Sequence, residues 1–507
     1  MLSSKNQEAI VSKKNKLSFV SAILIVIGSS IGAGIFLKND EILKNTQGMI
    51  YLAIIAWAIA IFAIVCLGLC LTELCSTSTK NKLGIIGWIK TFCNNYLYQI
   101  GKKFMAYIYL PINFFVMPYY SICTIQQAFP NSGFTKLDWY YVALIALLIS
   151  SWFILTSGMS TRATNIQNKI ITCVKFLPLI FAILIGYIYV GDTHHINEYT
   201  PVETKTPLFN ELSPVLGIFI SIPSIFFVFD GFYSTAGLQT EMNEPKKSAK
   251  AMLIGLLTVS CIDILISISL MISGKGSLEG LKEWFEEKNC YWLLQTMQLI
   301  VAIGIWGIIN GFALYSTNYY EELIDKNEVI FSNKIRNKMT SNSHLVGCLY
   351  SYCMFFTMFL LCTLVGSLCY IDTNAYQASN IGLNVHVCKL YSFVDLMANW
   401  TSALVFGCIV ISIIGALRNR KTNKIKTAND KNFVWAAYAT TIIVCFSLLM
   451  ILIETFVNLG LVCSYYSKGM YEGDAGNQNL VSAIMTVVVL FVFLVIMLSP
   501  YKHKKYN

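Results

Sequence analysis

Gly28-Ser-Ser-Ile-Gly-Ala-Gly-Ile-Phe36 interrupts the first long apolar segment of the chain, which covers residues 18–37. Each glycine inside a helix costs about 1 kcal/mol relative to alanine, so three glycines this close disfavour an ordinary helix. Two interpretations are open from these residues alone. Small residues let membrane helices pack closely. Alternatively, the helix unwinds here, and the freed N–H and C=O groups bind an anion and a cation.

The composition around this stretch is that of a membrane protein. Of the 507 residues, 56% are hydrophobic and only 13% are charged, and the mean hydropathy is +0.60. A soluble protein of this length needs more charge to cover its surface. The net charge of +10 raises the alternative of nucleic-acid binding. We exclude nucleic acid as a partner because the basic residues occupy short loops between apolar segments and form no single patch.

Twelve apolar segments are long enough to cross the hydrocarbon core, which takes about 20 residues of helix. They lack the alternation of barrel strands, so the sequence predicts an all-α integral membrane protein with twelve transmembrane helices. The segments are residues 18–37, 50–74, 104–129, 139–156, 168–190, 213–238, 251–274, 291–320, 345–370, 390–417, 433–457 and 479–499. Residues 84–90 are apolar but too short to span, and we interpret them as an interfacial or re-entrant stretch.

The basic residues predict how this bundle is oriented. If the N-terminus is cytoplasmic and the segments alternate, most of the 37 lysines and arginines fall on the cytoplasmic side, as membrane proteins favour. We therefore expect a multi-pass protein of the plasma membrane with both termini inside. The first apolar segment is longer than a signal peptide and has no small-residue cleavage site, so we expect it to be retained.

The sixth segment carries a second interruption. It contains Pro223, then Phe227-Val-Phe-Asp-Gly-Phe232, then Gly237. Asp230 is an ionisable residue in mid-span, which costs at least about 2.5 kcal/mol on insertion scales. Paired interruptions in corresponding places are typical of inverted-repeat transporters with a binding site at the membrane midplane. This pairing favours the unwound interpretation of the first segment.

Several stretches together resemble the amino acid–polyamine–organocation permeases. Residues 28–36 are similar to the first-helix motif GxGIGxGIF of that family, with Ser30 in place of one glycine. FVFDGFYSTAGLQTEMNEP, residues 227–245, resembles its sixth helix and the acidic stretch that follows. Residues 165–175, 307–311 and 71–74 are similar to parts of its fifth, eighth and second helices. The likeness covers residues 17–420.

The resemblance implies a fold and a domain organisation. It implies a five-plus-five inverted-repeat, LeuT-like core with broken helices 1 and 6. The core would cover residues 18–420 with helices 1–10, and residues 421–499 would hold helices 11 and 12. Residues 1–17 and 500–507 would be the cytoplasmic tails.

The resemblance also implies where an amino acid binds. Its α-carboxylate would meet the backbone N–H groups of Ala33 and Gly34. Its α-ammonium would meet backbone carbonyls near Ser30, Ile31, Phe227 and Asp230. Two broken helices supply the donor cluster and the acceptor cluster that a zwitterion needs. Phe227 matches an aromatic gate over the substrate, and an acid at Asp230 favours a cationic substrate.

Three other ionisable residues lie within the predicted spans. Lys175 is a snorkelling lysine, or it stands where sodium-dependent relatives place an ion, as the resemblance implies. In that position it could carry a coupled proton or act as a fixed cation. Glu73 is an interfacial acid or part of an inner gate. Asp263 is expected to face the bundle or a water path. The cysteines and histidines lack metal-site spacing, so we expect no metal and no cofactor.

These observations predict a secondary transporter, not an enzyme, that moves amino acids by alternating access and without sodium. Its partners would be the amino acid, the bilayer and either a proton or a counter-substrate. An exchanger of amino acids or polyamines is the alternative within this class. A polytopic membrane enzyme would need acids, histidines or serines gathered at one membrane face, and a channel would need a filter-like loop or charged ring. The sequence displays neither pattern.

Overall fold

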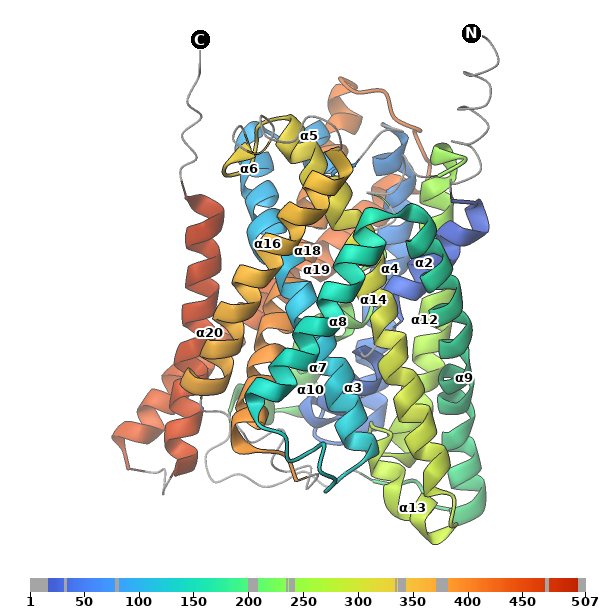
Figure 1. The fold of residues 1–507 in the computed structure, drawn as a ribbon, viewed down its shortest axis with the longest axis vertical. Coiled ribbons are helices and arrows are strands. Elements are labelled where there is room, and N and C mark those ends of the chain that lie inside the picture. The colour runs from blue at the N-terminus through green and yellow to red at the C-terminus, as the bar shows by residue number, and fades with distance from the viewer. Residues whose placement is uncertain are drawn as a thin grey trace.

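The computed structural model describes residues 17–31, 34–77, 82–198, 208–233, 236, 242–332, 335, 343–370, 382–469 and 474–499. Within these ranges the chain is a bundle of helices (Figure 1), with one isolated parallel bridge between Leu17 and Met242. The prediction of an all-α membrane protein is confirmed. The predicted tails lie almost entirely outside the described residues.

The helices follow the predicted segments. The first half of the chain forms α2 (Phe19–Ser30), α3 (Gly34–Asn45), α4 (Ile50–Ser76), α5 (Ile85–Phe92), α6 (Asn95–Phe104), α7 (Leu110–Ala128), α8 (Trp139–Met159), α9 (Thr161–Thr193) and α10 (Pro214–Val228). The second half forms α12 (Ser248–Ser273), α13 (Lys282–Glu287), α14 (Tyr291–Asp325), α16 (Ser343–Leu364), α18 (Val385–Thr422), α19 (Phe433–Ser467) and α20 (Asp474–Leu498). Short 3₁₀ turns lie at Phe209–Glu211, Pro245–Lys247 and Glu279–Leu281, and π-turns at Met105–Tyr109 and Val365–Cys369.

Ten of the described helical spans are long and apolar enough to cross a membrane, and the bent pair α2–α3 makes an eleventh. Within the described residues, the sixth predicted segment forms the 15-residue helix α10, which ends at Val228 where the chain breaks. The third span is longer than predicted, since α6 continues through the π-turn into α7 and the span begins at Asn95. The stretch 84–90 forms most of α5, a short helix.

Burial separates a central group of helices from a peripheral pair. In the span Asn95–Ala128, 94% of the apolar window is buried, against 22% in α19 and α20. The span formed by α6 and α7, together with α14 and α18, therefore forms the core, whereas α19 and α20 pack on its outside. The helices α5 and α6 lie at one end of the bundle and α13 at the other (Figure 1). Lys103 of α6 donates a hydrogen bond to the carbonyl of Ser499, so α20 ends beside α5 and α6.

Candidate functional site

The first membrane helix is broken where the glycines predicted. Its first half, α2, ends at Ser30, and Ile31 has an extended backbone (φ −76°, ψ 108°). Its second half, α3, begins at Gly34, and the two halves are bent by 44°. The residues between them, Gly32 and Ala33, lie outside the described part of the chain, so the structure gives no geometry for Ala33.

The second break follows α10. Helical geometry ends at Val228, and the N–H of Asp230 donates to the carbonyl of Phe227 (3.1 Å) in a tight turn. Gly231 has φ +103°, which residues with a side chain rarely adopt. The Asp-Gly pair therefore ends the helix by giving the chain a conformation that only glycine accepts easily. Gly237, the other glycine of this segment, lies outside the described residues.

The two breaks are in direct contact. A Cβ atom on Gly231 would lie 2.5 Å from the carbonyl oxygen of Ser29, and one on Gly34 would lie 2.9 Å from the Cα of Val228. Neither distance leaves room for a side chain, because the obstructing atoms belong to backbone. The glycines thus break the helices and also let the broken ends pack closely, so the packing interpretation and the unwinding interpretation are compatible.

Lys175 of α9 binds the broken end of α2. Its Nζ donates to the carbonyls of Ile27 (3.1 Å), Gly28 (3.0 Å) and Ile31 (2.6 Å), and the side chain is 3% exposed. The last carbonyls of a helix carry partial negative charge and lack helical partners. An ammonium group with three donors therefore satisfies this helix end. Snorkelling does not describe the position, because the amine points into the bundle.

Asp263 lies behind this contact on α12. It is fully buried, its charge interacts with Lys175, and neither carboxylate oxygen has a hydrogen-bond partner among the described residues. The prediction that Asp263 faces the bundle is therefore correct. Its proximity to a buried lysine offsets part of the cost of a carboxylate there.

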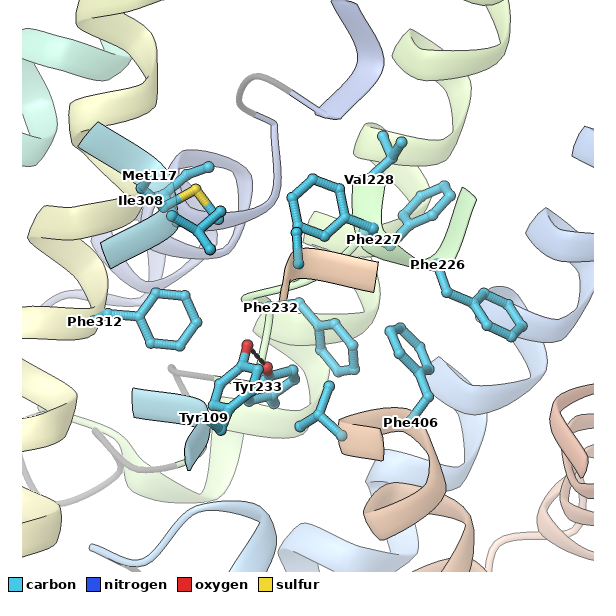
Figure 2. Close-up of a cluster of buried hydrophobic side chains, with 14 of the residues drawn as sticks. Tyr109, Met117, Phe226, Phe227, Val228, Phe232, Tyr233, Ile308, Phe312 and Phe406 are labelled. Carbon is cyan, nitrogen blue, oxygen red and sulfur yellow. Dashed lines mark hydrogen bonds between the residues drawn. The ribbon is translucent and has the colours of Figure 1, made fainter. Parts of the chain in front are cut away.

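Asp230 is held by two tyrosines. Tyr109, from the π-turn before α7, donates to its Oδ1 (2.8 Å), and Tyr233 donates to the same oxygen (2.5 Å). The two hydroxyl groups also bond to each other, and Figure 2 shows them pointing toward one another. Asp230 is 6% exposed. One of its two carboxylate oxygens is therefore already engaged by protein hydroxyl groups.

Apolar side chains from several helices surround these tyrosines. Figure 2 places Met117 of α7, Ile308 and Phe312 of α14, and Phe227 of α10 around one buried region. Phe312 packs edge-on against Tyr109 with ring centroids 5.8 Å apart. The sequence analysis missed Tyr109, Met117, Ile308 and Phe312. No sequence signal separates them from the many other aromatic and aliphatic residues of membrane helices.

Phe227 belongs to a second, charged cluster, which the sequence analysis also missed. Its ring lies edge-on to Tyr120 (centroids 5.9 Å apart) and 5.7 Å from the Nζ of Lys38. Lys38 of α3 is 2% exposed and pairs with Glu41 (2.8 Å) and with Asp395 of α18 (3.3 Å). We call Lys38, Glu41, Asp395 and Tyr120 the α3 latch. It connects the second half of helix 1 to α18 and, through Tyr120, to α7.

Glu73 closes a different ion-pair network at the end of α4. Its carboxylate pairs with Arg420 of α18 (Nε to Oε1, 2.9 Å) and accepts hydrogen bonds from the side chain of Thr427 and the N–H of Asp430. The Glu73 side chain is 1% exposed. This buried ion pair therefore holds the α18–α19 connection against α4. A simple interfacial acid would instead be solvated.

The predicted substrate residues thus have different surroundings. Ser30 has a buried hydroxyl with no partner among the described atoms, whereas the carbonyl of Ile31 already accepts from Lys175. Gly34 and Phe227 lie on facing halves of the two broken helices, and Asp230 lies at the tyrosine pair. No group of three or more His, Cys, Asp or Glu side chains able to hold a metal occurs within the described ranges.

Comparison with known proteins gives this geometry a context. Residues 17–502 match the family model described as amino acid permease. An uncharacterized protein of Mycoplasma pneumoniae is 36% identical over 96% of this chain and 94% of its own length. The human large neutral amino acids transporter small subunit 2 is 24% identical, in a match that covers 61% of this chain and 58% of that protein.

Two further likenesses concern a bacterial exchanger and a solved structure. The serine/threonine exchanger SteT of Bacillus subtilis is 23% identical over 64% of this chain and 71% of its own. The structure of MhsT in complex with L-phenylalanine superposes with a TM-score of 0.52 at 12% identity, over 86% of this chain and 98% of that one. At this identity the likeness is one of fold, and it is the LeuT-like fold that the family resemblance implied.

Proposed function

The chain belongs to the amino acid permease family, and on this premise we propose that it carries amino acids across the plasma membrane by alternating access, without sodium. Family membership makes it a membrane transporter and argues against the membrane-enzyme alternative. The observation that carries the finer proposal is the contact between two broken helices, with Lys175 bound to the end of one of them.

The helix ends supply both poles that a zwitterion needs. Gly34, the first residue of α3, lies against Val228, the last residue of α10. The positive end of one half-helix therefore faces the negative end of another. We propose that the α-carboxylate binds N–H groups of Ala33 and Gly34, and the α-ammonium binds free carbonyls near Ser30, Ile31, Phe227 and Asp230. A carbonyl has two lone pairs, so that of Ile31 can accept from both Lys175 and substrate.

Lys175 supports sodium independence. Three carbonyl oxygens converge on its ammonium group, and converging carbonyls of a broken helix are also what a transported sodium ion would need. The ammonium group of Lys175, which is attached to the chain, would therefore take the place of a transported sodium ion. Asp263 interacts with the same lysine, so a proton shared by this pair is the coupling that we propose if uptake follows a proton gradient.

The surroundings of the helix ends favour a neutral substrate. Met117, Ile308, Phe312 and Phe227 are apolar. The carboxylate of Asp230, which on sequence grounds favoured a cationic substrate, accepts from two tyrosines. Relatives that carry large neutral amino acids and that exchange serine and threonine support the same choice by their names. The exchanger relative also supports the alternative that this chain exchanges one amino acid for another.

The packing agrees with an orientation that has both termini of the chain in the cytoplasm. The end of α20 lies beside α6, on the side that holds α5 (Figure 1), and the basic residues Lys90, Lys102 and Lys103 lie on these two helices. Basic residues favour the cytoplasmic side. We therefore propose that this end of the bundle is cytoplasmic and that α13 is external.

The test is uptake of radiolabelled amino acids and amines into proteoliposomes, with a proton gradient, with a sodium gradient, with internal counter-substrate, or with none. We expect uptake of a neutral amino acid that is unchanged when potassium replaces sodium. Uptake that requires a sodium gradient would contradict the role of Lys175. No uptake or exchange of any compound in the panel would contradict the assignment as a whole.

A further inference from the structure

A second cavity lies away from the broken-helix site, between the core and the peripheral helices. Its volume is about 440 Å³, within the range of small-molecule sites. Walls come from α3, α10 and α18 on one side and from α19 and α20 on the other. Its polar lining includes Glu41, Asn399, Glu454, Asn458 and Thr486. We call this space the peripheral cavity.

Acidic side chains outnumber basic ones in and beside the peripheral cavity. Four carboxylates lie in or beside it, on Asp40, Glu41, Asp395 and Glu454, against the two lysines Lys38 and Lys44. Lys44 pairs with Asp40 (2.6 Å), and Lys38 serves both Glu41 and Asp395. Glu454 has neither a hydrogen-bond nor an ion-pair partner in the described part of the chain. An apolar bundle that leaves a carboxylate unpaired in a cavity favours occupation by a cation.

A second group in the same wall lacks a partner. The Oδ1 of Asn399 is buried and accepts no hydrogen bond from any described residue. Buried acceptors are rarely left unsatisfied, so the wall offers an amide oxygen as well as a carboxylate. A primary ammonium brings three N–H donors and one positive charge and satisfies both groups. A bare metal ion would need several converging ligands, and a space of this volume is too large to supply them.

We propose that the peripheral cavity is a binding site for a small organic amine, whose ammonium group is held by Glu454 and Asn399. The amine is a free metabolite or the ammonium headgroup of a lipid, since both present the same chemistry. This site is distinct from the substrate site proposed at the broken helices, and its occupation does not depend on which amino acid the protein carries.

The peripheral cavity is also connected to the α3 latch. Glu41 lines the cavity, pairs with Lys38, and accepts a hydrogen bond from Ser224 of α10 (2.9 Å). An amine held by Glu454 and Asn399 therefore also lies in the electrostatic field of the Glu41 carboxylate, which Lys38 already uses. Two cations that compete for one acid bind with negative coupling. Removal of Lys38 should accordingly strengthen amine binding.

The binding test uses the purified full-length protein in detergent, with butylamine as the probe, followed by calorimetry and by thermal stability. We expect saturable binding that weakens at least tenfold in Glu454→Gln. Glu287→Gln, which neutralises an exposed acid of α13, should bind butylamine as the unsubstituted protein does. Butanol, which has the same chain without the charge, should not bind. Equal binding of butanol, or an unchanged affinity in Glu454→Gln, would overturn the proposal.

Three further measurements separate this site from its alternatives. The best neutral amino-acid substrate of the uptake panel should not compete with butylamine; competition would place the amine at the substrate site and overturn the proposal. Lys38→Met should bind butylamine more tightly, and weaker binding would contradict the shared use of Glu41. Weaker binding in nanodiscs of phosphatidylethanolamine than in phosphatidylcholine would identify the lipid headgroup as the source, and equal binding would identify a soluble amine.

The outcome of the butylamine binding test does not depend on whether the protein transports amino acids. Butylamine binding with no amino-acid uptake would support the peripheral site and contradict the proposed function, whereas uptake without butylamine binding would do the reverse. If Glu454→Gln does not fold, Asn399→Asp provides the second variant. It adds a carboxylate to the same wall and should strengthen binding, and unchanged or weaker binding would count against the site.

Discussion

Replacement of Gly34 by alanine tests whether the close contact between the two broken helices is needed for transport. The added Cβ would lie 2.9 Å from the Cα of Val228 and 3.4 Å from its Cγ2. Carbon atoms pack best at about 3.5–4.0 Å, and the obstructing atom is backbone. The half-helices α3 and α10 must therefore separate by about 0.6–1.1 Å to admit one methyl group.

The expected magnitude follows from the cost of overpacking. Extra methyl groups in a packed interior cost about 1–3 kcal/mol, which lowers the population of the closely packed arrangement about 5- to 150-fold. If the transport cycle passes through this arrangement, the maximal uptake rate of Gly34→Ala should decrease by a factor of about 5 to 150. Gly34→Leu should abolish uptake, because no shift of this size admits its side chain.

The assay is uptake of the best substrate of the panel into proteoliposomes with equal amounts of folded protein, checked by size-exclusion chromatography. Gly460→Ala is the matched control, since a Cβ at this position of α19 meets nothing within 4 Å. The control should transport like the unsubstituted protein. Wild-type uptake by a correctly inserted Gly34→Leu would refute the reasoning and would make helix 1 a packing element only.

Three other substitutions have defined outcomes. Lys175→Met leaves the buried carbonyls of Gly28 and Ile31 without this donor, at about 1–3 kcal/mol for each unsatisfied group. Both thermal stability and uptake should therefore drop, whether sodium is present or absent. Retained uptake would show that the lysine is dispensable. Glu73→Gln removes the buried partner of Arg420 and should destabilise the protein by about 3–5 kcal/mol. The double variant Glu73→Gln/Arg420→Met should recover part of this stability. No recovery would mean that the unpaired charge is not the cause. Glu279 lies in the loop after α12, and its pKa is raised from 4.5 to about 7 by burial and then by the nearby charge of Asp40. The folded state therefore holds this proton more tightly than the unfolded state does. The stability of the folded protein should decline as the pH rises from 4.5 to about 7. In Glu279→Gln this part of the decline in melting temperature should be missing, and parallel curves for the two proteins would contradict the effect.

The positions of the membrane helices were predictable because each depends on local composition. About 20 apolar residues are needed to cross the hydrocarbon core, so segments such as 50–74 and 251–274 match α4 and α12 closely. The two breaks were also predictable. A glycine inside a helix lowers the stability of that helix, so clustered glycines predict a break. Gly231, with φ +103°, has a backbone conformation that few other residues adopt.

The side chains around the breaks were less accessible to prediction. Tyr233 lies only three residues after Asp230, but Tyr109 binds the same carboxylate from 121 residues away, and nothing in its local sequence indicates this contact. The α3 latch likewise depends on Asp395, which lies 357 residues from its partner Lys38 along the chain. Sequence patterns identified Asp230 and Lys175 only because ionisable residues are expensive inside a membrane and therefore conspicuous.

The sequence by itself determined that this chain crosses the membrane many times, that helices 1 and 6 break, and that Lys175 is an ionisable residue within a membrane span. Each of these follows from the free energy of placing particular residues in hydrocarbon or in a helix. Only the tertiary structure decided which carbonyls Lys175 binds, that Gly34 lies against Val228, and that Glu454 is left unpaired in a cavity beside the α3 latch. These contacts join residues far apart in the chain, and their energies depend on distances that only the packing of the helices sets.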